Sequence, residues 1–122
     1  MTILALDIGK KRVGVAISHG IVAEPIKVLD YKNYFSSLEK LIKEQSVDLV
    51  VIGLPFSASG GETNQSFFNR SEGEKIAKKF AVNVEYVDES YSSVAVDTNK
   101  KIIDDEAAKI ILEQYLNEKK LL

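Results

Sequence analysis

The sequence predicts an α/β fold in which a mixed five-stranded sheet carries helices on both faces, and three observations predict it. Two apolar arms at 3–8 and 13–18 are joined by a short basic turn, which is typical of an antiparallel hairpin. A nearly continuous apolar run at 47–52 indicates a strand buried on both faces of a parallel sheet. Strands then alternate with helical patterns to the end of the chain. At this length, residues 1–122 are expected to form one domain.

The first hairpin contains the most informative residues of the chain. Asp7 interrupts an otherwise apolar arm, where a carboxylate is costly unless a cation, a hydrogen-bond donor or water meets it. We therefore interpret Asp7 as a metal ligand. The turn that follows is Lys10, Lys11 and Arg12, which are candidate phosphate contacts, although a solvated turn has the same composition.

Helical spacing of apolar residues predicts three helices, over 31–46, 63–80 and 103–118. Their aromatic residues are expected in the core, so no platform for stacked bases is expected; these residues are Phe35, Phe68, Phe80 and Tyr115. Lysines of the second helix are expected on its solvated face, namely Lys75, Lys78 and Lys79.

The remaining strands lie between these helices. Pro25 favours an edge strand over 25–29, because proline tolerates only the start or edge of a sheet. The buried strand at 47–52 is expected to end at Gly53-Leu54-Pro55, and a further parallel strand is expected over 82–87. Three antiparallel strands are thus followed by two parallel ones.

Composition restricts the kind of protein. With no cysteine, disulfides and thiolate metal sites are excluded, and a cytoplasmic location follows as the default. No apolar run is long enough to span a bilayer, so no membrane partner is expected. A net charge of −2 is unusual for a nucleic-acid-binding domain, but local basic clusters matter more than the sum.

Three carboxylates from distant segments are the candidate catalytic centre. Asp7 lies near the end of the first strand and Glu89 just beyond the end of the last, with Asp88 as the alternative ligand. Sites of α/β sheets lie beyond the carboxyl ends of parallel strands, so these side chains are expected to meet. Asp104 begins the apolar stripe of the last helix, although acids are also favoured in any first helical turn. Such a set suits Mg²⁺ or Mn²⁺ and phosphodiester hydrolysis.

Several of these motifs, in this order, resemble the YqgF/RuvX family. The opening string Asp7–Ser18 resembles the first family motif. The likeness continues through later motifs over nearly the whole chain. These later motifs are Gly53-Leu54-Pro55, Gly61 with Gln65, Asp88-Glu89, and Asp104 with Ala107-Ala108 and the following Ile110–Leu116. The resemblance implies an RNase H-like fold and a cytoplasmic, metal-dependent nuclease. The family is described as a processor of the 5′ end of pre-16S ribosomal RNA and as a Holliday-junction resolvase.

The resemblance also implies roles for particular residues. The acidic triad of the family falls on Asp7, Glu89 and Asp104, and its basic turn falls on Lys11 and Arg12. Lys101, just before the last helix, is a further candidate contact to nucleic acid. Expected partners are structured RNA or branched DNA. The protein is expected as a monomer or a homodimer, because symmetric cutting of a junction needs two active sites.

Two departures from the family pattern keep other functions open. Ser90 stands where the family has arginine, and the segment before the last helix is shorter than usual. A non-catalytic nucleic-acid-binding or ribosome-associated module with the same fold is therefore the alternative function. The glycine-flanked hairpin also resembles the phosphate loop of actin-like kinases, but that fold needs two such domains.

Overall fold

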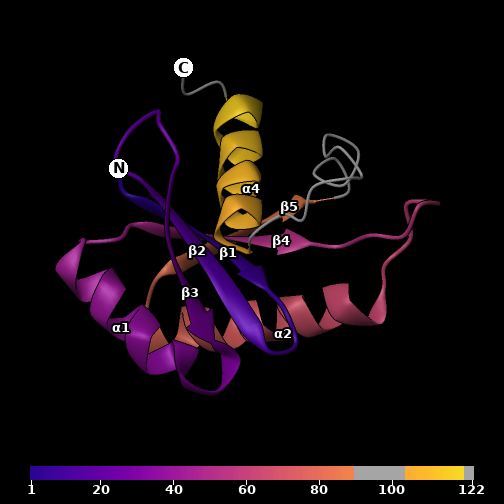
Figure 1. Ribbon diagram of the computed structural model, residues 1–122, viewed down its shortest axis with the longest axis horizontal. Helices are drawn as coiled ribbons and strands as arrows, with labels where there is room; N and C mark the ends of the chain where they lie inside the picture. Colours follow the sequence, from indigo (N-terminus) through magenta and orange to yellow (C-terminus); the bar gives the residue numbers. More distant parts are fainter. Residues whose placement is uncertain (90–103, 120–122) are drawn as a thin grey trace.

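The computed structural model describes residues 1–89 and 104–119, and of Asp104 and Asp105 it describes the backbone alone. Its centre is a five-stranded sheet with the strand order β3-β2-β1-β4-β5 (Figure 1). The strands are β1 (Ile3–Ile8), β2 (Arg12–Ser18), β3 (Glu24–Asp30), β4 (Leu49–Leu54) and β5 (Asn83–Asp88). β1, β2 and β3 pair antiparallel, whereas β4 pairs parallel with both β1 and β5. The predicted mixed sheet and the edge position of the proline-containing strand are confirmed.

Helices cover both faces of the sheet. α1 (Tyr34–Glu44), which a short 3-10 turn precedes, and α2 (Asn64–Phe80) lie on one face, and α4 (Asp104–Glu118) lies on the other (Figure 1). Successive strand residues alternate between these faces. In β1, Leu4, Leu6 and Ile8 therefore pack toward α1 and α2, while Ile3 and Ala5 pack toward α4. Asp7 belongs to the second set and lies on the α4 face.

The core explains why the apolar patterns form these elements. Each of the six residues of β4 is buried, as expected for a strand between two neighbours and two helix layers. Burying a Leu or Ile side chain contributes about 1.5–3 kcal/mol. On α4 the buried stripe is the one that the sequence predicts, and it includes Ala108, Ile111, Leu112 and Tyr115. Tyr34 of α1 is also buried.

β4 ends at Leu54, within the predicted Gly53-Leu54-Pro55 motif, because its pairing with β5 extends to Asp88 and the Glu89 amide donates to the Leu54 carbonyl at 3.1 Å. One prediction of local structure is wrong. Phe68 does not enter the core but is 39% exposed. The face of α2 that meets the sheet is instead largely polar, and consists of Ser66, Asn69, Glu72, Gly73 and Ile76.

α2 begins where the sequence predicts. The Thr63 hydroxyl accepts from the Ser66 amide at 3.0 Å, and the Ser66 hydroxyl accepts from the Thr63 amide at 2.9 Å, which is a reciprocal capping box. Phe35 and Phe80 pack half-buried against the core and Tyr115 is buried, as predicted. Within the described ranges, none of the helices combines the length and the apolar character needed to cross a membrane.

Candidate active site

Asp7 and Glu89 meet at the carboxyl ends of the parallel strands. Asp7 is the fifth residue of β1, and Glu89 directly follows β5. Their carboxyl groups share a hydrogen bond, although β4 separates the two strands. Two strand spacings amount to about 9.5 Å, so the side chains must reach toward each other across β4. Two acids from the first and the last strand of the chain therefore form one site, as predicted from the sequence.

Gly53 of β4 makes this meeting possible. It lies on the α4 face between β1 and β5, opposite Val87 in the register of β4 and β5. A Cβ at this position would collide with Oε2 of Glu89 and Cδ1 of Ile111. The Glu89 carboxyl group thus occupies the space that a side chain on β4 would otherwise fill. The glycine of the Gly-Leu-Pro motif is therefore required because the site needs the space, and not because of a turn.

The carboxyl pair has an unusual proton affinity. Burial raises the pKa of Glu89 to about 8, and the neighbouring Asp7 carboxylate, its hydrogen bond with Glu89 and the charge of Asp88 act in the same direction. Like charges at this separation cannot both ionise without cost, so the pair keeps one proton near neutral pH. In its protonated form the Glu89 carboxyl group can donate this hydrogen bond to Asp7. A divalent cation between the two groups would remove the need for that proton.

α4 begins at the same edge of the sheet. Ile111 lies against Gly53, and four residues later the Tyr115 hydroxyl donates to Glu85 of β5 at 3.3 Å. α4 therefore runs antiparallel to β5. Its first residue, Asp104, precedes Ile111 by seven residues, or about 10 Å along the axis, and so belongs to the end beyond the strand termini. The side chain of Asp104 lies outside the described residues, as does Lys101.

The basic turn lies beside Asp7. The Gly9 amide donates to the Arg12 carbonyl at 2.8 Å, which closes the turn, and the Tyr31 amide donates to the Lys11 carbonyl at 2.9 Å, which joins the turn to the end of β3. A hollow of about 140 Å³ is lined by Asp7, Gly9 and the three basic residues Lys10, Lys11 and Arg12. The structure thus brings the predicted phosphate contacts next to the first carboxylate.

Two amide side chains of α2 hold the strand ends in place, and only one of them was identified from the sequence. Asn69, 1% exposed, donates to the Gly53 carbonyl at 3.0 Å and accepts from Gln65 at 2.8 Å. Gln65 also donates to the Ile8 carbonyl at 3.3 Å. Sequence reasoning missed Asn69, although its spacing of four from Gln65 places both amides on one side of the helix. They connect the ends of β1 and β4, which carry Asp7 and Gly53.

Other candidate residues lie elsewhere. Asp88 follows the strand alternation toward the α2 face, whereas Glu89 points to the α4 face and shares a hydrogen bond with Asp7. His19 is exposed beyond the end of β2, beside Thr2, at the opposite edge of the sheet. Among the side chains described, no three His, Cys, Asp or Glu residues group closely enough to hold a metal ion.

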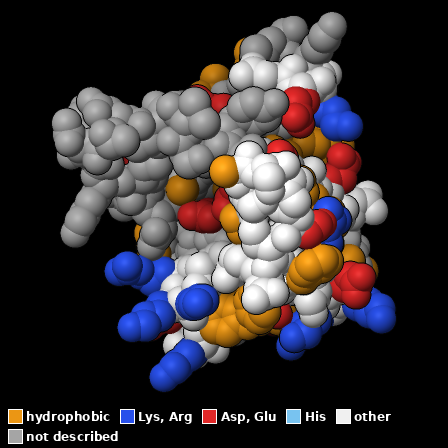
Figure 2. Space-filling view, turned by 90° about the vertical axis from the view of Figure 1, so that its right-hand side faces the viewer, with side chains coloured by type: hydrophobic (Ala, Val, Ile, Leu, Met, Phe, Trp, Pro, Cys, Tyr) orange, Lys and Arg blue, Asp and Glu red, His pale blue; other side chains and the backbone are white. Residues whose placement is uncertain are grey.

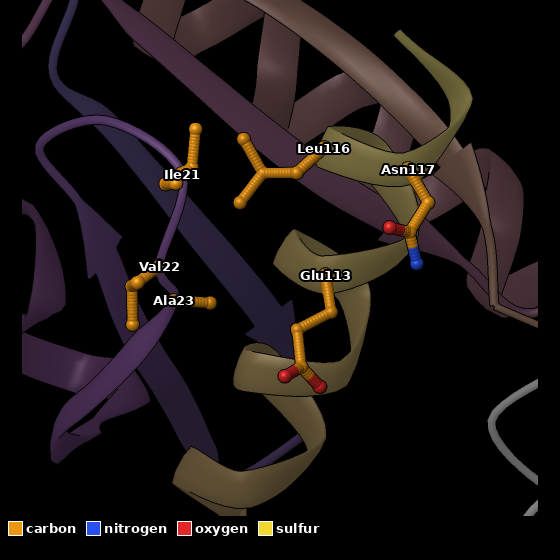
Figure 3. A pocket seen from close by; sticks show the side chains of 6 residues that line it. All are labelled: Ile21, Val22, Ala23, Glu113, Leu116 and Asn117. Carbon is orange, nitrogen blue, oxygen red and sulfur yellow. The ribbon is translucent and has the colours of Figure 1, made fainter. Parts of the chain in front are cut away.

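A second hollow of about 410 Å³ lies far from this edge, between the β2–β3 connection and the last turns of α4 (Figure 3). Ile21, Val22 and Ala23 line one side of it, and Glu113, Leu116 and Asn117 of α4 line the other. Leu116 lies 12 residues after the start of α4, which is about 18 Å along the helix axis. The acid Glu113 at this hollow does not suit a phosphate group, and none of the described basic residues lines it, so the carboxyl ends of the strands are the candidate site.

Comparison with known proteins agrees with this geometry. A family model described as "RuvX: Holliday junction resolvase" matches residues 1–118. This chain belongs to the RuvX family. Related chains carry the name "Putative pre-16S rRNA nuclease": one from Paraburkholderia phytofirmans is 35% identical over 95% of this chain and 88% of its own length, and one from Fusobacterium nucleatum is 36% identical over 96% and 97%.

A solved structure places this RuvX-family chain in a wider fold class. Thermus thermophilus RuvC, in complex with a Holliday junction substrate, superposes with a TM-score of 0.67 and 10% sequence identity over 98% of this chain and 96% of RuvC. At that identity the likeness concerns the fold, which is RNase H-like, as the sequence resemblance implies. The family and the fold class predicted from the motifs are both confirmed.

Proposed function

We propose that this protein is a metal-dependent endonuclease that hydrolyses phosphodiester bonds at the carboxyl edge of its sheet. The main evidence for the proposal is the hydrogen-bonded pair of Asp7 and Glu89. β1 and β5 place these two carboxyl groups next to each other over Gly53. Two acids that share a proton at a strand-end site are a source of oxygen ligands for a divalent cation. A pair that served only stability would not place like charges together.

Asp7, Glu89 and Asp104 are the proposed catalytic residues and the proposed ligands of Mg²⁺ or Mn²⁺. The two described carboxyl groups fit such an ion, because they are adjacent, are hard oxygen donors and lose their mutual repulsion when a cation lies between them. Position 104 lies two helical turns before Ile111, which contacts this site, and so shares its helix face. When bound, the ion would activate a water molecule and stabilise the leaving oxygen.

The protein's own groups bind and position the substrate around this centre. Lys10, Lys11 and Arg12 would hold phosphates of the nucleic-acid backbone next to Asp7, in the hollow that they line. Lys101 is proposed to contact the same backbone from before α4. Gly53 leaves room for Glu89, and Asn69 fixes the Gly53 carbonyl, so both act as positioning residues. The first turn of α4 presents the positive end of its helix dipole to this edge.

The proposed substrate is structured RNA at the 5′ end of pre-16S ribosomal RNA, or a Holliday junction. The names of the related chains favour the first and the description of the family model favours the second. The proposed location is the cytoplasm, where either substrate would be met.

Cleavage assays with both substrates test the proposal. A labelled RNA that spans the leader and the mature 5′ end of 16S RNA, and a labelled four-way DNA junction, are each incubated with the protein and Mg²⁺ or Mn²⁺. We expect cleavage of one of them, lost on chelation, and reduced by at least about 100-fold in Asp7→Asn and Glu89→Gln. Asp104→Asn is expected to have an effect of the same order.

Glu44→Gln is the matched control, because Glu44 is an exposed acid near the end of α1 and its substitution removes the same charge. Its rate should equal that of the wild type. Cleavage that persists in Asp7→Asn contradicts the proposed centre. Tight binding by the wild type without cleavage of either substrate would favour the non-catalytic binding module.

A further inference from the structure

A pocket of about 390 Å³ opens next to the basic turn, on the side of the sheet that α1 and α2 cover. Its lining residues come from three segments, the basic turn, the 3-10 turn before α1 and the first turns of α2, and are Lys10, Tyr31, Asn64, Gln65 and Phe68. We call it the Tyr31–Phe68 pocket. Its volume falls in the usual range of small-molecule sites, about 300–1,000 Å³. The lining combines aromatic rings, amides and a cation, which are the groups that recognise a base, its edges and its phosphate.

Two aromatic rings form the apolar wall. The ring centroids of Tyr31 and Phe68 lie 5.9 Å apart with an interplanar angle of 42°. Phe68 is 39% exposed, so part of its ring is accessible to a ligand. Figure 2, which views the molecule from the side of the α2 N-terminus, shows hydrophobic side chains beside a group of Lys and Arg side chains at the lower edge.

The Tyr31 ring is held rigidly before any ligand arrives. Its hydroxyl donates to the buried Glu72 carboxylate at 3.0 Å, and its ring packs against Tyr34 at a centroid distance of 5.4 Å. A ring that is already fixed loses little conformational entropy when a base stacks on it. Burial and the hydrogen bond to Glu72 raise the pKa of Tyr31, so the ring stays neutral and does not repel a phosphate.

The pocket adjoins the candidate active site through a shared lysine. Lys10 lines both the Tyr31–Phe68 pocket and the hollow beside Asp7. A further hollow of about 360 Å³ connects the same turn to the end of β3 and is lined by Lys10, Lys11, Asp30, Tyr31 and Lys32. Gln65 joins the pocket wall to the carboxyl end of β1 through its hydrogen bond to Ile8. One strand of nucleic acid can therefore follow the lysines from the pocket to the carboxylates.

We propose that the Tyr31–Phe68 pocket binds an unpaired nucleotide of the substrate, with its base against the two aromatic rings and its phosphate on Lys10. The Asn64 amide and the side-chain oxygen of Gln65 would contact polar edges of that base, while the Gln65 amide nitrogen keeps its bonds to Ile8 and Asn69. This inference rests on the proposed function, because it takes the substrate to be nucleic acid. It adds that the protein engages a single-stranded nucleotide near the cleaved bond, in RNA or in DNA.

Equilibrium binding of labelled oligonucleotides tests this inference. Affinities are measured by fluorescence anisotropy in the Asp7→Asn background, which prevents turnover, with RNA and DNA hairpins that carry an unpaired overhang and with the same stems fully paired. Phe68→Leu keeps an apolar side chain but removes the aromatic ring. We expect it to weaken binding to the overhang by about 5- to 100-fold and to leave binding to the paired stems within twofold.

Phe67→Leu is the matched control. Phe67 is the neighbouring residue of α2, is 59% exposed and is not a lining residue of the pocket, so its variant should bind like the wild type. The difference in affinity between the RNA and the DNA hairpins shows whether the pocket prefers a ribonucleotide or a deoxyribonucleotide. Equal losses for overhang and paired stems, equal losses in the two variants, or no loss in Phe68→Leu would overturn the pocket assignment.

Cleavage by the otherwise wild-type protein separates this inference from the proposed function. If the protein cleaves its substrate and Phe68→Leu shows no selective loss of binding to the overhang, the pocket assignment is wrong and the nuclease proposal is supported. If the protein binds the overhang through Phe68 and cleaves neither substrate, the nuclease proposal is wrong and the pocket assignment is supported. If it binds no oligonucleotide, both are overturned.

Discussion

Glu72 and Glu89 are both acids packed against the central sheet, on opposite faces, and their surroundings are opposite in kind. Glu72, 2% exposed, accepts from the hydroxyl of Tyr34 at 2.5 Å, from that of Tyr31 at 3.0 Å and from the Lys75 ammonium at 3.2 Å. Glu89 meets the carboxyl group of Asp7 instead. One acid is satisfied by donors that the fold supplies, whereas the other keeps a proton that a cation can replace.

The difference indicates what each face of the sheet is for. On the α1 and α2 face, donors converge on one carboxylate, which joins α2 to α1 and to the turn before it. On the α4 face, a glycine makes room for two acids to approach each other at a cost in stability. Residues that lower stability in this manner are characteristic of sites built for function.

The largest expected effect comes from closing the space at Gly53. In Gly53→Ala the added methyl group collides with Oε2 of Glu89 and with Ile111, and the least costly relief moves the Glu89 carboxyl group away from Asp7. We expect the rate of metal-dependent cleavage to fall by about 100-fold or more, since the ligands are no longer adjacent. The measurement is a single-turnover cleavage rate at saturating Mg²⁺ or Mn²⁺.

Gly73→Ala is the matched control on the other face. Its added methyl group collides with the ring and hydroxyl of Tyr86 and lies in α2, away from the carboxyl pair. Overpacking is expected to lower the free energy of unfolding by about 1–3 kcal/mol, partly offset by a gain of about 0.5–1 kcal/mol in helix propensity. Its cleavage rate should stay close to that of the wild type. Equal losses of activity in both variants would remove the special role of Gly53.

A smaller effect is expected in the pH dependence of stability without metal. The pKa of Glu89 is raised to about 8 in the folded protein and is about 4.5 in the unfolded chain, so the folded state binds the proton more tightly. The stabilisation is complete below pH 4.5 and is lost as pH rises toward 8, by an amount on the order of a few kcal/mol. Urea unfolding in the presence of a chelator, from pH 5 to pH 9, measures it.

Glu89→Gln sharpens this comparison. The glutamine amide donates to Asp7 without a titrating proton, so this variant should lose that part of the pH dependence and should be more stable than the wild type at pH 8 without metal. Added Mg²⁺ should stabilise the wild type more strongly as pH rises and should have little effect on the variant. A wild type whose stability in chelator rises from pH 6 to pH 8 would contradict the shared proton.

The smallest of these effects is expected at Glu72. In Glu72→Gln the two tyrosine hydroxyls lose a charged acceptor, and we expect the free energy of unfolding to fall by about 2 kcal/mol. Catalytic metal binding should not change, since Glu72 lies on the other face of the sheet. Urea unfolding and Mn²⁺ titration of the same variant test both parts. A stability equal to that of the wild type would show that the two acids differ less than their contacts suggest.

Most of the fold was predictable because its signals are local. The apolar run of β4, the glycine-flanked hairpin and the apolar stripe of α4 each report burial through neighbouring residues alone. The orientation of α2 was not predictable in this manner. Its sheet-facing side carries Ser66, Asn69 and Glu72, and hydrophobicity alone therefore placed Phe68 on the wrong side.

The candidate site was likewise only partly predictable from the sequence. Asp7 and Glu89 were identified from their positions at strand ends, and the structure brings them together. Asn69 was missed, since an asparagine within a helix gives no signal until its acceptor, the Gly53 carbonyl, is known. The same holds for Tyr31, whose ring becomes a pocket wall only because Phe68 of another helix lies beside it.

By itself the sequence determined the order of strands and helices, the family and the two acids that meet. It could do so because alternation, glycine and proline positions, and lone charges in apolar strands act over a few residues. Only the tertiary structure decided that Gly53 makes room for Glu89, that Glu72 is satisfied by two tyrosines, and that Phe68 faces outward beside Tyr31. These facts depend on contacts between segments far apart in the chain, and no local pattern records which donor, ring or empty space a side chain will meet.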